Sequence, residues 1–283
     1  MNSYQQFINQ QPSFTLKTNF LIFLLLLTAS SCTVNLLSGK KQMTLLPEAV
    51  LQSMANDEYR SFLTDSKIVT ANQSGDAKMV KRVGDRVIAA VKKYYQDKGI
   101  AAQLEGFNWE VTLVEDEEVN AWCMPGGKIV VYTGLLPISK TEEGLAIIMG
   151  HEVSHALLQH GNQRMSQGIL QLVGEVAIEV AVANKPEETQ NLFLGAFGIG
   201  TEVGLLLPFS RKHELEADRF GLNFAAMAGY NPQEAIPLWE RMKEASEEGS
   251  SIDFFSTHPS EGRRIEQFKK MMPEALSYYQ NKK

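Results

Sequence analysis

Two histidines four residues apart stand in a segment with the apolar spacing of a buried helix. Residues 151–155 read His-Glu-Val-Ser-His, and leucine, isoleucine and alanine are frequent in the surrounding residues 139–160. An α-helix turns about 100° per residue, so His151 and His155 lie on one face and can reach the same metal ion. Buried imidazoles need a polar partner, so the segment predicts a metal-binding helix in the core and disfavours a solvated surface helix.

This helix is expected to begin at Ser139, because Ser139 and Glu142 have the spacing of a capping box. It is expected to run to His160, with Gly161 as its C-cap. On such a continuous helix His160 lies about 140° from His155 and faces away from the metal. Its expected role is electrostatic, at the helix end.

The residue types on the helix favour zinc. Zinc takes nitrogen and oxygen ligands in a tetrahedral arrangement, and a catalytic zinc has three protein ligands and one open position. Glu152 directly follows the first histidine, so its side chain lies beside the ion. There it can take a proton from a water that the metal activates.

A second segment, residues 213–218, can complete the site. Glu214 and Asp218 are four residues apart and share a helix face. Glu214 can supply the third ligand, and Asp218 can accept the N–H of a ligating histidine and so orient its ring. Glu216 is the competing ligand, but it lies about 200° from Glu214 and only one of them can face the metal. His213 is expected beside the site or at the surface.

Several shorter motifs accompany these two segments. They are Asn120-Ala121-Trp122, Pro125-Gly126-Gly127, Thr133-Gly134-Leu135, Ser210-Arg211, Gly229-Tyr230-Asn231-Pro232 and Thr257-His258-Pro259 with Arg264. Together with the histidine motif they make the chain resemble metallopeptidase family 48 over roughly residues 80–270. This family includes the CaaX prenyl proteases, the HtpX-type membrane proteases and periplasmic lipoproteins of the BepA and LoiP type. The chain resembles the short lipoprotein members, which have no helical-repeat domain.

The resemblance implies a fold and a site. The fold is α+β, a predominantly α-helical, gluzincin-like zincin domain with a small β-sheet beside the active-site helix. The implied ligands of one zinc ion are His151, His155 and Glu214, with Glu152 as the general base. In the lipoprotein branch the histidine of the Thr-His-Pro loop can close the fourth zinc position, which would make His258 a latch. A purely local role is the alternative for His258, and Arg264 could stabilise the oxyanion or only form an ion pair.

Alternating apolar residues predict a strand at residues 109–113. Residues 128–133 are predicted to form a second strand, with an extended segment between the two. Asn120, Ala121 and Trp122 are the candidate sheet edge, on which a peptide substrate could add as a further strand. Core packing is the alternative for Trp122. The neighbouring Cys123 is expected to be buried, and a nucleophilic role for it is disfavoured.

The rest of the chain has mainly helical patterns, and no repeat is found. They cover residues 47–98, 165–184, 190–207, 210–228 and most of the remainder. The two segments within residues 169–207 are interpreted as a soluble helical pair over the active site, because they contain glutamates that are costly in lipid. Shallow membrane contact is the alternative.

The first residues have the pattern of a targeting segment. Residues 20–27 form an apolar run that is too short to span a bilayer, with Lys17 before it and small residues and Cys32 after it. We expect a lipoprotein signal peptide over residues 1–31, lipidation of Cys32, a tether over residues 32–47 and a single peptidase domain over the remaining residues, 48–283. An ordinary signal peptide is the alternative. The expected location is the bacterial cell envelope, facing the periplasm.

The composition narrows the possible functions. The formal net charge is −6, from 33 acidic and 27 basic residues, which disfavours nucleic acid as a partner. The predicted function is zinc-dependent endopeptidase, cutting misfolded or unassembled envelope proteins, with membrane attachment through the lipid anchor. The competing function is a zinc-containing chaperone or assembly factor that does not cleave. A closed site with four protein ligands would favour that alternative. The sequence does not exclude a third function, that of an exopeptidase.

Overall fold

The central layer of the molecule is a small β-sheet. The computed structural model describes residues 32–72, 74–173, 186–197, 210–247, 258 and 264–280. Within them, four strands form a sheet in the order β3-β4-β6-β5. The strands are β3 (Ile68–Val69), β4 (Glu110–Val114), β5 (Ala121–Met124) and β6 (Lys128–Tyr132). Strands β4 and β6 are parallel, and β5 pairs antiparallel with β6 at the edge.

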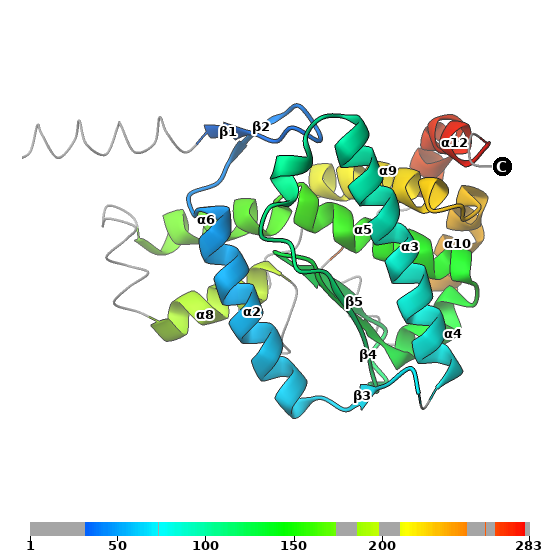
Figure 1. Cartoon of the computed structure of the whole chain (residues 1–283), viewed down its shortest axis with the longest axis horizontal. Helices are drawn as coiled ribbons and strands as arrows, with labels where there is room; N and C mark the ends of the chain where they lie inside the picture. Colours follow the sequence, from blue (N-terminus) through cyan, green and yellow to red (C-terminus); the bar gives the residue numbers. More distant parts are fainter. Residues whose placement is uncertain are drawn as a thin grey trace, which may run out of the picture.

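Helices cover both faces of this sheet, so the expected α+β class is confirmed (Figure 1). The helices are α2 (Glu48–Asp65), α3 (Gly75–Asp97), α4 (Leu136–Ser139), α5 (Glu142–Leu157), α6 (His160–Val173), α8 (Pro186–Ala196), α9 (Arg211–Met227), α10 (Ala235–Glu247) and α12 (Arg264–Gln280). Short 3₁₀ turns lie at Ala101–Leu104, Thr133–Leu135 and Pro232–Glu234.

Side chains alternate between two hydrophobic clusters along the sheet. Ala121 and Cys123 face the larger cluster, which includes α3, α5, α9, α10 and α12. Trp122 and Met124 face the smaller one, which includes α2, α6 and α8. Both faces are therefore buried, and β5 and β6 contain apolar residues at almost every position.

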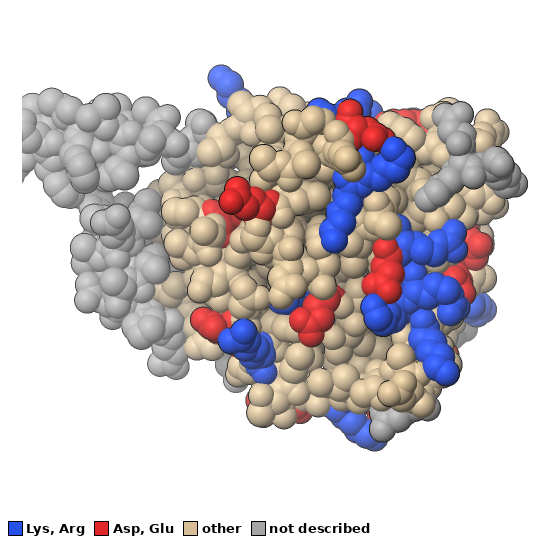
Figure 2. Space-filling model, in the orientation of Figure 1, with Lys and Arg blue, Asp and Glu red and all other residues tan. Residues whose placement is uncertain are grey.

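Charged residues are interspersed on the outer surface of α3. Figure 2 shows basic and acidic side chains side by side over this part of the molecule. Helix α3 carries two ion pairs with the four-residue spacing of a helix face, Lys81–Asp85 and Lys93–Asp97. The absence of a nucleic-acid partner stays a prediction.

Two glycines, one on each helix, let α5 and α9 pack so closely that their backbones are in contact. A Cβ atom on Gly150 would lie 2.5 Å from the carbonyl oxygen of Gly221. A Cβ atom on Gly221 would lie 2.5 Å from the backbone nitrogen of His151. Backbone atoms cannot move aside as a flexible side chain can, so this contact sets the separation of the two helices that carry the predicted metal ligands.

We expect Gly221→Ala to lower the free energy of unfolding by about 1–3 kcal/mol, because the added methyl group forces the two helices apart. Denaturant-induced unfolding measures this change. Gly75→Ala is the control, since a Cβ atom at the start of α3 has no neighbour within 4 Å. Unfolding of Gly221→Ala at the wild-type denaturant concentration would contradict the close-contact interpretation.

The ends of α5 differ from the sequence-based expectation. The cap is Thr141, whose hydroxyl accepts a hydrogen bond from Gly144 N at 3.0 Å, while Ser139 ends α4. At the other end α5 stops at Leu157, and Gln159 has a φ of +56°. The predicted capping box and the continuous helix to His160 are therefore wrong. Local spacing could not show this, because the bend depends on contacts with distant segments.

The bend after α5 is fixed by contacts of Gln159 with α2 and with the segment of residues 41–43. The side chain of Gln159 donates to Glu48 Oε2 at 3.1 Å and hydrogen-bonds the side chain of Gln42. Burial of Glu48 raises its pKa to about 7, against an ordinary value of 4.5, although hydrogen bonds from Gln159 and Gln52 lower it. The folded protein therefore favours the protonated form of this carboxyl.

The sign of the resulting pH dependence follows from the raised pKa. The unfolded chain ionises Glu48 first as the pH rises above about 4.5, so this group makes the folded state lose stability between about pH 4.5 and pH 7. We expect Glu48→Gln to match wild type near pH 4 and to be more stable at pH 8, by at most about 3 kcal/mol. Denaturant titrations at both pH values test this, with the exposed Glu244→Gln as control. An equal difference at both pH values would refute it.

The segment expected to be a tether is an ordered hairpin. Strands β1 (Cys32–Val34) and β2 (Lys41–Met43) pair antiparallel. Asn35 Nδ2 donates to the carbonyl oxygen of Leu157 at 2.9 Å, which joins the hairpin to the end of α5. The targeting segment, residues 1–31, lies outside the described residues, so the signal peptide, the lipidation of Cys32 and the domain boundaries stay predictions.

The helical pair expected within residues 169–207 is described only in part. Helices α6 and α8 contact each other through Ile169, Leu192 and Phe193 in the smaller hydrophobic cluster. The rest of this stretch lies outside the described residues. Among the helices that the structure describes, none combines the length and the apolar character needed to cross a bilayer.

Candidate metal centre

Helices α5 and α9 bring the predicted ligands together. Four donor atoms lie within 4.8 Å of one another, and all four residues are buried: His151, His155, Glu214 and His258. His151 Nε2 is 3.0 Å from His155 Nε2 and 3.3 Å from His258 Nδ1. Glu214 Oε1 is 3.0 Å from His258 Nδ1 and 3.4 Å from His155 Nε2.

These spacings fit a zinc ion. Bonds of 2.0–2.1 Å in a tetrahedral arrangement place the ligand atoms about 3.3 Å from one another. Three imidazole nitrogens and one carboxylate oxygen are also the atom types that zinc prefers. The cluster therefore fits a zinc ion, and His258, from the segment between α10 and α12, offers a fourth donor atom.

The charge states of Glu214 and His155 suit metal binding. Burial alone would raise the pKa of Glu214, but His258, His155 and Arg264 hold it well below its ordinary value, so the side chain is a carboxylate. Burial lowers the pKa of His155 well below its ordinary value, which favours the neutral imidazole. Metal ligands must be deprotonated, so both groups are in the form that binds.

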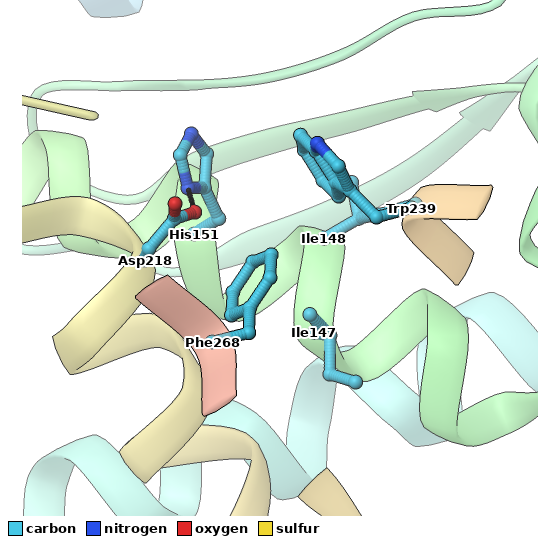
Figure 3. A pocket seen from close by; sticks show the side chains of 6 residues that line it. All are labelled: Ile147, Ile148, His151, Asp218, Trp239 and Phe268. Carbon is cyan, nitrogen blue, oxygen red and sulfur yellow. Dashed lines mark hydrogen bonds and ion pairs between the residues drawn. The ribbon is translucent and has the colours of Figure 1, made fainter. Parts of the chain in front are cut away.

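The ring of His151 is oriented by Asp218, as the four-residue spacing on α9 predicts. Asp218 Oδ1 lies 2.9 Å from His151 Nδ1, and Figure 3 shows the carboxylate at that ring nitrogen. A carboxylate at this position favours the tautomer with hydrogen on Nδ1, which leaves Nε2 for the metal. A small cavity next to the ring is lined by Ile147, Ile148, His151, Asp218, Trp239 and Phe268.

Arg264 holds Asp218 in place. Its Nε donates to Asp218 Oδ2 at 2.7 Å and one terminal nitrogen to Oδ1 at 2.6 Å. The other terminal nitrogen lies 3.0 Å from Glu214 Oε2, and the guanidinium stacks 3.9 Å from the centre of the Trp239 ring. Burial alone would raise the pKa of Asp218, but Arg264 and His151 lower it, so a buried carboxylate orients the ligand ring.

Glu152 lies beside the donors and is not one of them. It is 3% exposed, and its Oε1 is 3.6 Å from His258 Nε2. Burial raises its pKa above the ordinary value, against the lowering effect of His258 and His151. A carboxyl with a raised pKa next to a metal site has the properties of a general base.

Glu216, the competing ligand, faces away from the donors. It forms an ion pair with Lys40 at 2.5 Å, and its Oε2 lies 3.7 Å from His160 Nε2. His160 Nδ1 is 3.0 Å from His155 Nδ1, so the expectation that His160 has only a helix-end role is wrong. His213 is buried and stacks on His160 with 4.2 Å between ring centres. Sequence reasoning missed this contact because it assumed that α5 continues to His160.

The candidate substrate edge lies on β5, at the side of the sheet next to α5. Asn120, Ala121 and Trp122 are all buried. The Trp122 ring packs edge-on against Phe62, with 5.1 Å between ring centres, so this side chain belongs to the core. Cys123 is buried as expected, and burial raises the pKa of its thiol well above the ordinary value, which disfavours a nucleophilic role.

Similarity to known proteins supports a peptidase site of this kind. The sequence pattern of peptidase family M48 matches residues 77–272, more than half of the chain. The chain belongs to peptidase family M48. Among M48 relatives, the mitochondrial metalloendopeptidase OMA1 of Schizosaccharomyces pombe is 33% identical over 224 residues, which cover 78% of this chain and 61% of that protein. OMA1 of Saccharomyces cerevisiae is 35% identical over 199 residues, covering 67% and 55% respectively.

A bacterial member of the M48 family is less similar. The β-barrel assembly-enhancing protease of Escherichia coli is 27% identical over 158 residues, which cover 54% of this chain and 32% of that protein. The family resemblance is thus confirmed, but the lipoprotein subtype is not supported. The predicted location in a bacterial envelope is wrong, since the more similar relatives are mitochondrial proteins. A short apolar run with a basic flank does not by itself identify a compartment.

Proposed function

We propose that this M48 peptidase is a zinc-dependent endopeptidase that cleaves unfolded or unassembled polypeptides. The observation that carries the proposal is the buried carboxyl of Glu152 next to a cluster of donors with zinc spacing. Both OMA1 relatives are named as metalloendopeptidases, which supports the same activity. The chain spans between half and two thirds of the length of these two relatives.

The residues of the site have separate roles in this proposal. Zinc, when bound, polarises the carbonyl group of the scissile bond and lowers the pKa of a water molecule. His151, His155 and Glu214 hold the ion. Glu152 takes a proton from the attacking water and later gives it to the leaving amine. All three nitrogens of Arg264 face Asp218 or Glu214, so we assign Arg264 to orientation of the ligands.

The substrate is proposed to bind as a strand along β5. This strand has one hydrogen-bonded neighbour in the described sheet, β6, and so has a second edge at which a peptide backbone could pair. The contact of β5 with α5, the helix that carries Glu152, supports this proposal. Side-chain selectivity is not assigned to Trp122, because its ring is in the core.

His258 is proposed to be a latch. A zinc ion with four protein ligands has no open position for water or substrate. His258 Nδ1 lies within 3.3 Å of both His151 Nε2 and Glu214 Oε1, so it can fill the fourth position. The same closed arrangement favours the second candidate function, a chaperone or assembly factor that keeps zinc and does not cleave.

The basic test measures metal content and cleavage together. The purified chain is expected to hold about one zinc ion per molecule and to cut an unfolded, reduced model protein at internal bonds. Removal of the metal with a chelator should stop cleavage, and added zinc should restore it. A chain without bound zinc, or cleavage that is unaffected by the chelator, would refute the proposed function. Release of single terminal residues would indicate an exopeptidase.

A further inference from the structure

The ligand His155 has an outer partner that comes from the start of α6. His155 Nε2 faces the other donors, at 3.0 Å from His151 Nε2, so Nε2 is the metal-binding nitrogen. Its hydrogen is therefore on Nδ1, which lies 3.0 Å from His160 Nδ1. His155 donates this hydrogen bond, and His160 must accept it with a deprotonated Nδ1. The hydrogen of His160 is then on Nε2.

The carboxylate of Glu216 favours this tautomer of His160. His160 Nε2 lies 3.7 Å from Glu216 Oε2, and Glu216 Oε1 lies 2.5 Å from Lys40 Nζ. A carboxylate on this side favours the form of His160 with hydrogen on Nε2. His160 is 1% exposed, so water does not compete for its ring nitrogens.

The series of contacts from His155 through His160 and Glu216 ends at Lys40, in the hairpin of β1 and β2. Lys40 directly precedes β2, and the hairpin is joined to α5 by the hydrogen bond from Asn35 to the carbonyl oxygen of Leu157. Asn162 on α6 donates to the carbonyl oxygen of Leu46 at 2.9 Å, just after β2. Figure 1 shows the hairpin above the start of α6. Hydrogen bonds to α5 and α6 on both sides of Lys40 thus hold it near Glu216.

We propose that His160, Glu216 and Lys40 are positioning residues for the metal ligand His155, so that the β1–β2 hairpin contributes to zinc affinity. The inference rests on the zinc site of the proposed function and is independent of whether the protein cleaves peptides. His151 has a comparable chain, through Asp218 to Arg264 on α12. Each of the two ligand histidines on α5 would then be oriented by a buried side chain. A basic residue from a distant part of the sequence, Arg264 or Lys40, fixes each of these arrangements.

The expected effects concern zinc affinity. Loss of an outer partner of a ligand histidine typically weakens metal binding about 10–100-fold. We expect His160→Phe to have an effect of this size, because phenylalanine keeps the ring but cannot accept the hydrogen bond. His160→Gln should recover part of the loss, since its amide oxygen can accept from His155. Lys40→Met should have a smaller effect, about 3–10-fold, because it acts through Glu216.

The experiment uses the full chain stripped of metal by dialysis against a chelator. Zinc is titrated in competition with a chromophoric chelator, which gives the dissociation constant for each variant. Thermal unfolding is followed with and without zinc. Lys41→Met is the matched control for Lys40→Met, because Lys41 is the next residue, is exposed and belongs to the same hairpin.

The outcomes separate positioning from general stability. The inference predicts weaker zinc binding in His160→Phe and Lys40→Met, unchanged binding in Lys41→Met, and a smaller zinc-induced rise in the unfolding temperature. Wild-type zinc affinity in both His160→Phe and Lys40→Met would overturn it. Equal weakening by Lys40→Met and Lys41→Met would also overturn it. If wild type binds zinc and cleaves no substrate, weaker binding in the variants still supports the inference while the proposed cleavage fails.

Discussion

Replacement of Glu152 by glutamine is expected to slow peptide-bond cleavage about 10²–10⁴-fold and to leave zinc binding unchanged. Glutamine has nearly the same size and shape as glutamate but cannot take a proton from water at neutral pH. The metal-binding atoms belong to other residues, so the donor cluster stays complete. Cleavage of an unfolded protein and the zinc content of the same sample measure the two effects separately.

Glu143→Gln on the first turn of α5 is the control, because it makes the same chemical change on the same helix away from the donors. It should cleave at the wild-type rate. Loss of zinc together with activity in Glu152→Gln would assign Glu152 a structural role in the metal site. A wild-type cleavage rate in Glu152→Gln would remove this residue from the mechanism.

Replacement of His258 by alanine is expected to raise the cleavage rate, because it removes the donor that closes the fourth zinc position. If the closed arrangement is about 90% populated, opening the site increases the rate about tenfold. Zinc affinity should fall at the same time, since one donor is lost. The initial cleavage rate at saturating zinc isolates the first effect from the second.

His258→Asp is the informative companion, because a carboxylate can still bind the metal and keep the site closed. It should remain close to the slow wild-type rate. A slower rate in His258→Ala than in wild type would refute the latch and make His258 a residue that cleavage needs. Bound zinc with no cleavage by wild type or by His258→Ala, on several unfolded substrates, would favour the non-cleaving assembly factor.

Sequence patterns predicted the strands of the fold more accurately than the ends of its helices. Strands β4 and β6 lie within a residue or so of the predicted segments, since the apolar pattern of a short segment is a local property. The helix ends are less well predicted. Ser139 and Thr141 are both suitable caps by type, and only the end of α4 decides that Thr141 is the cap.

The prediction for residues 32–47 was wrong for a different reason. Residues 32–47 are polar enough to be interpreted as a tether, yet β1 and β2 are held by hydrogen bonds to α5 and α6. Such contacts join residues more than a hundred positions apart, and no local pattern encodes them. The predicted compartment failed for a related reason, because the pattern of a short targeting segment says little about the protein that follows it.

The sequence by itself determined which residues of the site share one helix, since helical periodicity alone places His151 beside His155 and Glu214 beside Asp218. Only the tertiary structure decided which other groups reach them. The contact of Gly150 with Gly221 sets the distance between α5 and α9. The bend after α5 turns His160 toward His155, and the segment before α12 brings in His258. These contacts depend on how separate elements pack, and packing is a property of the whole fold.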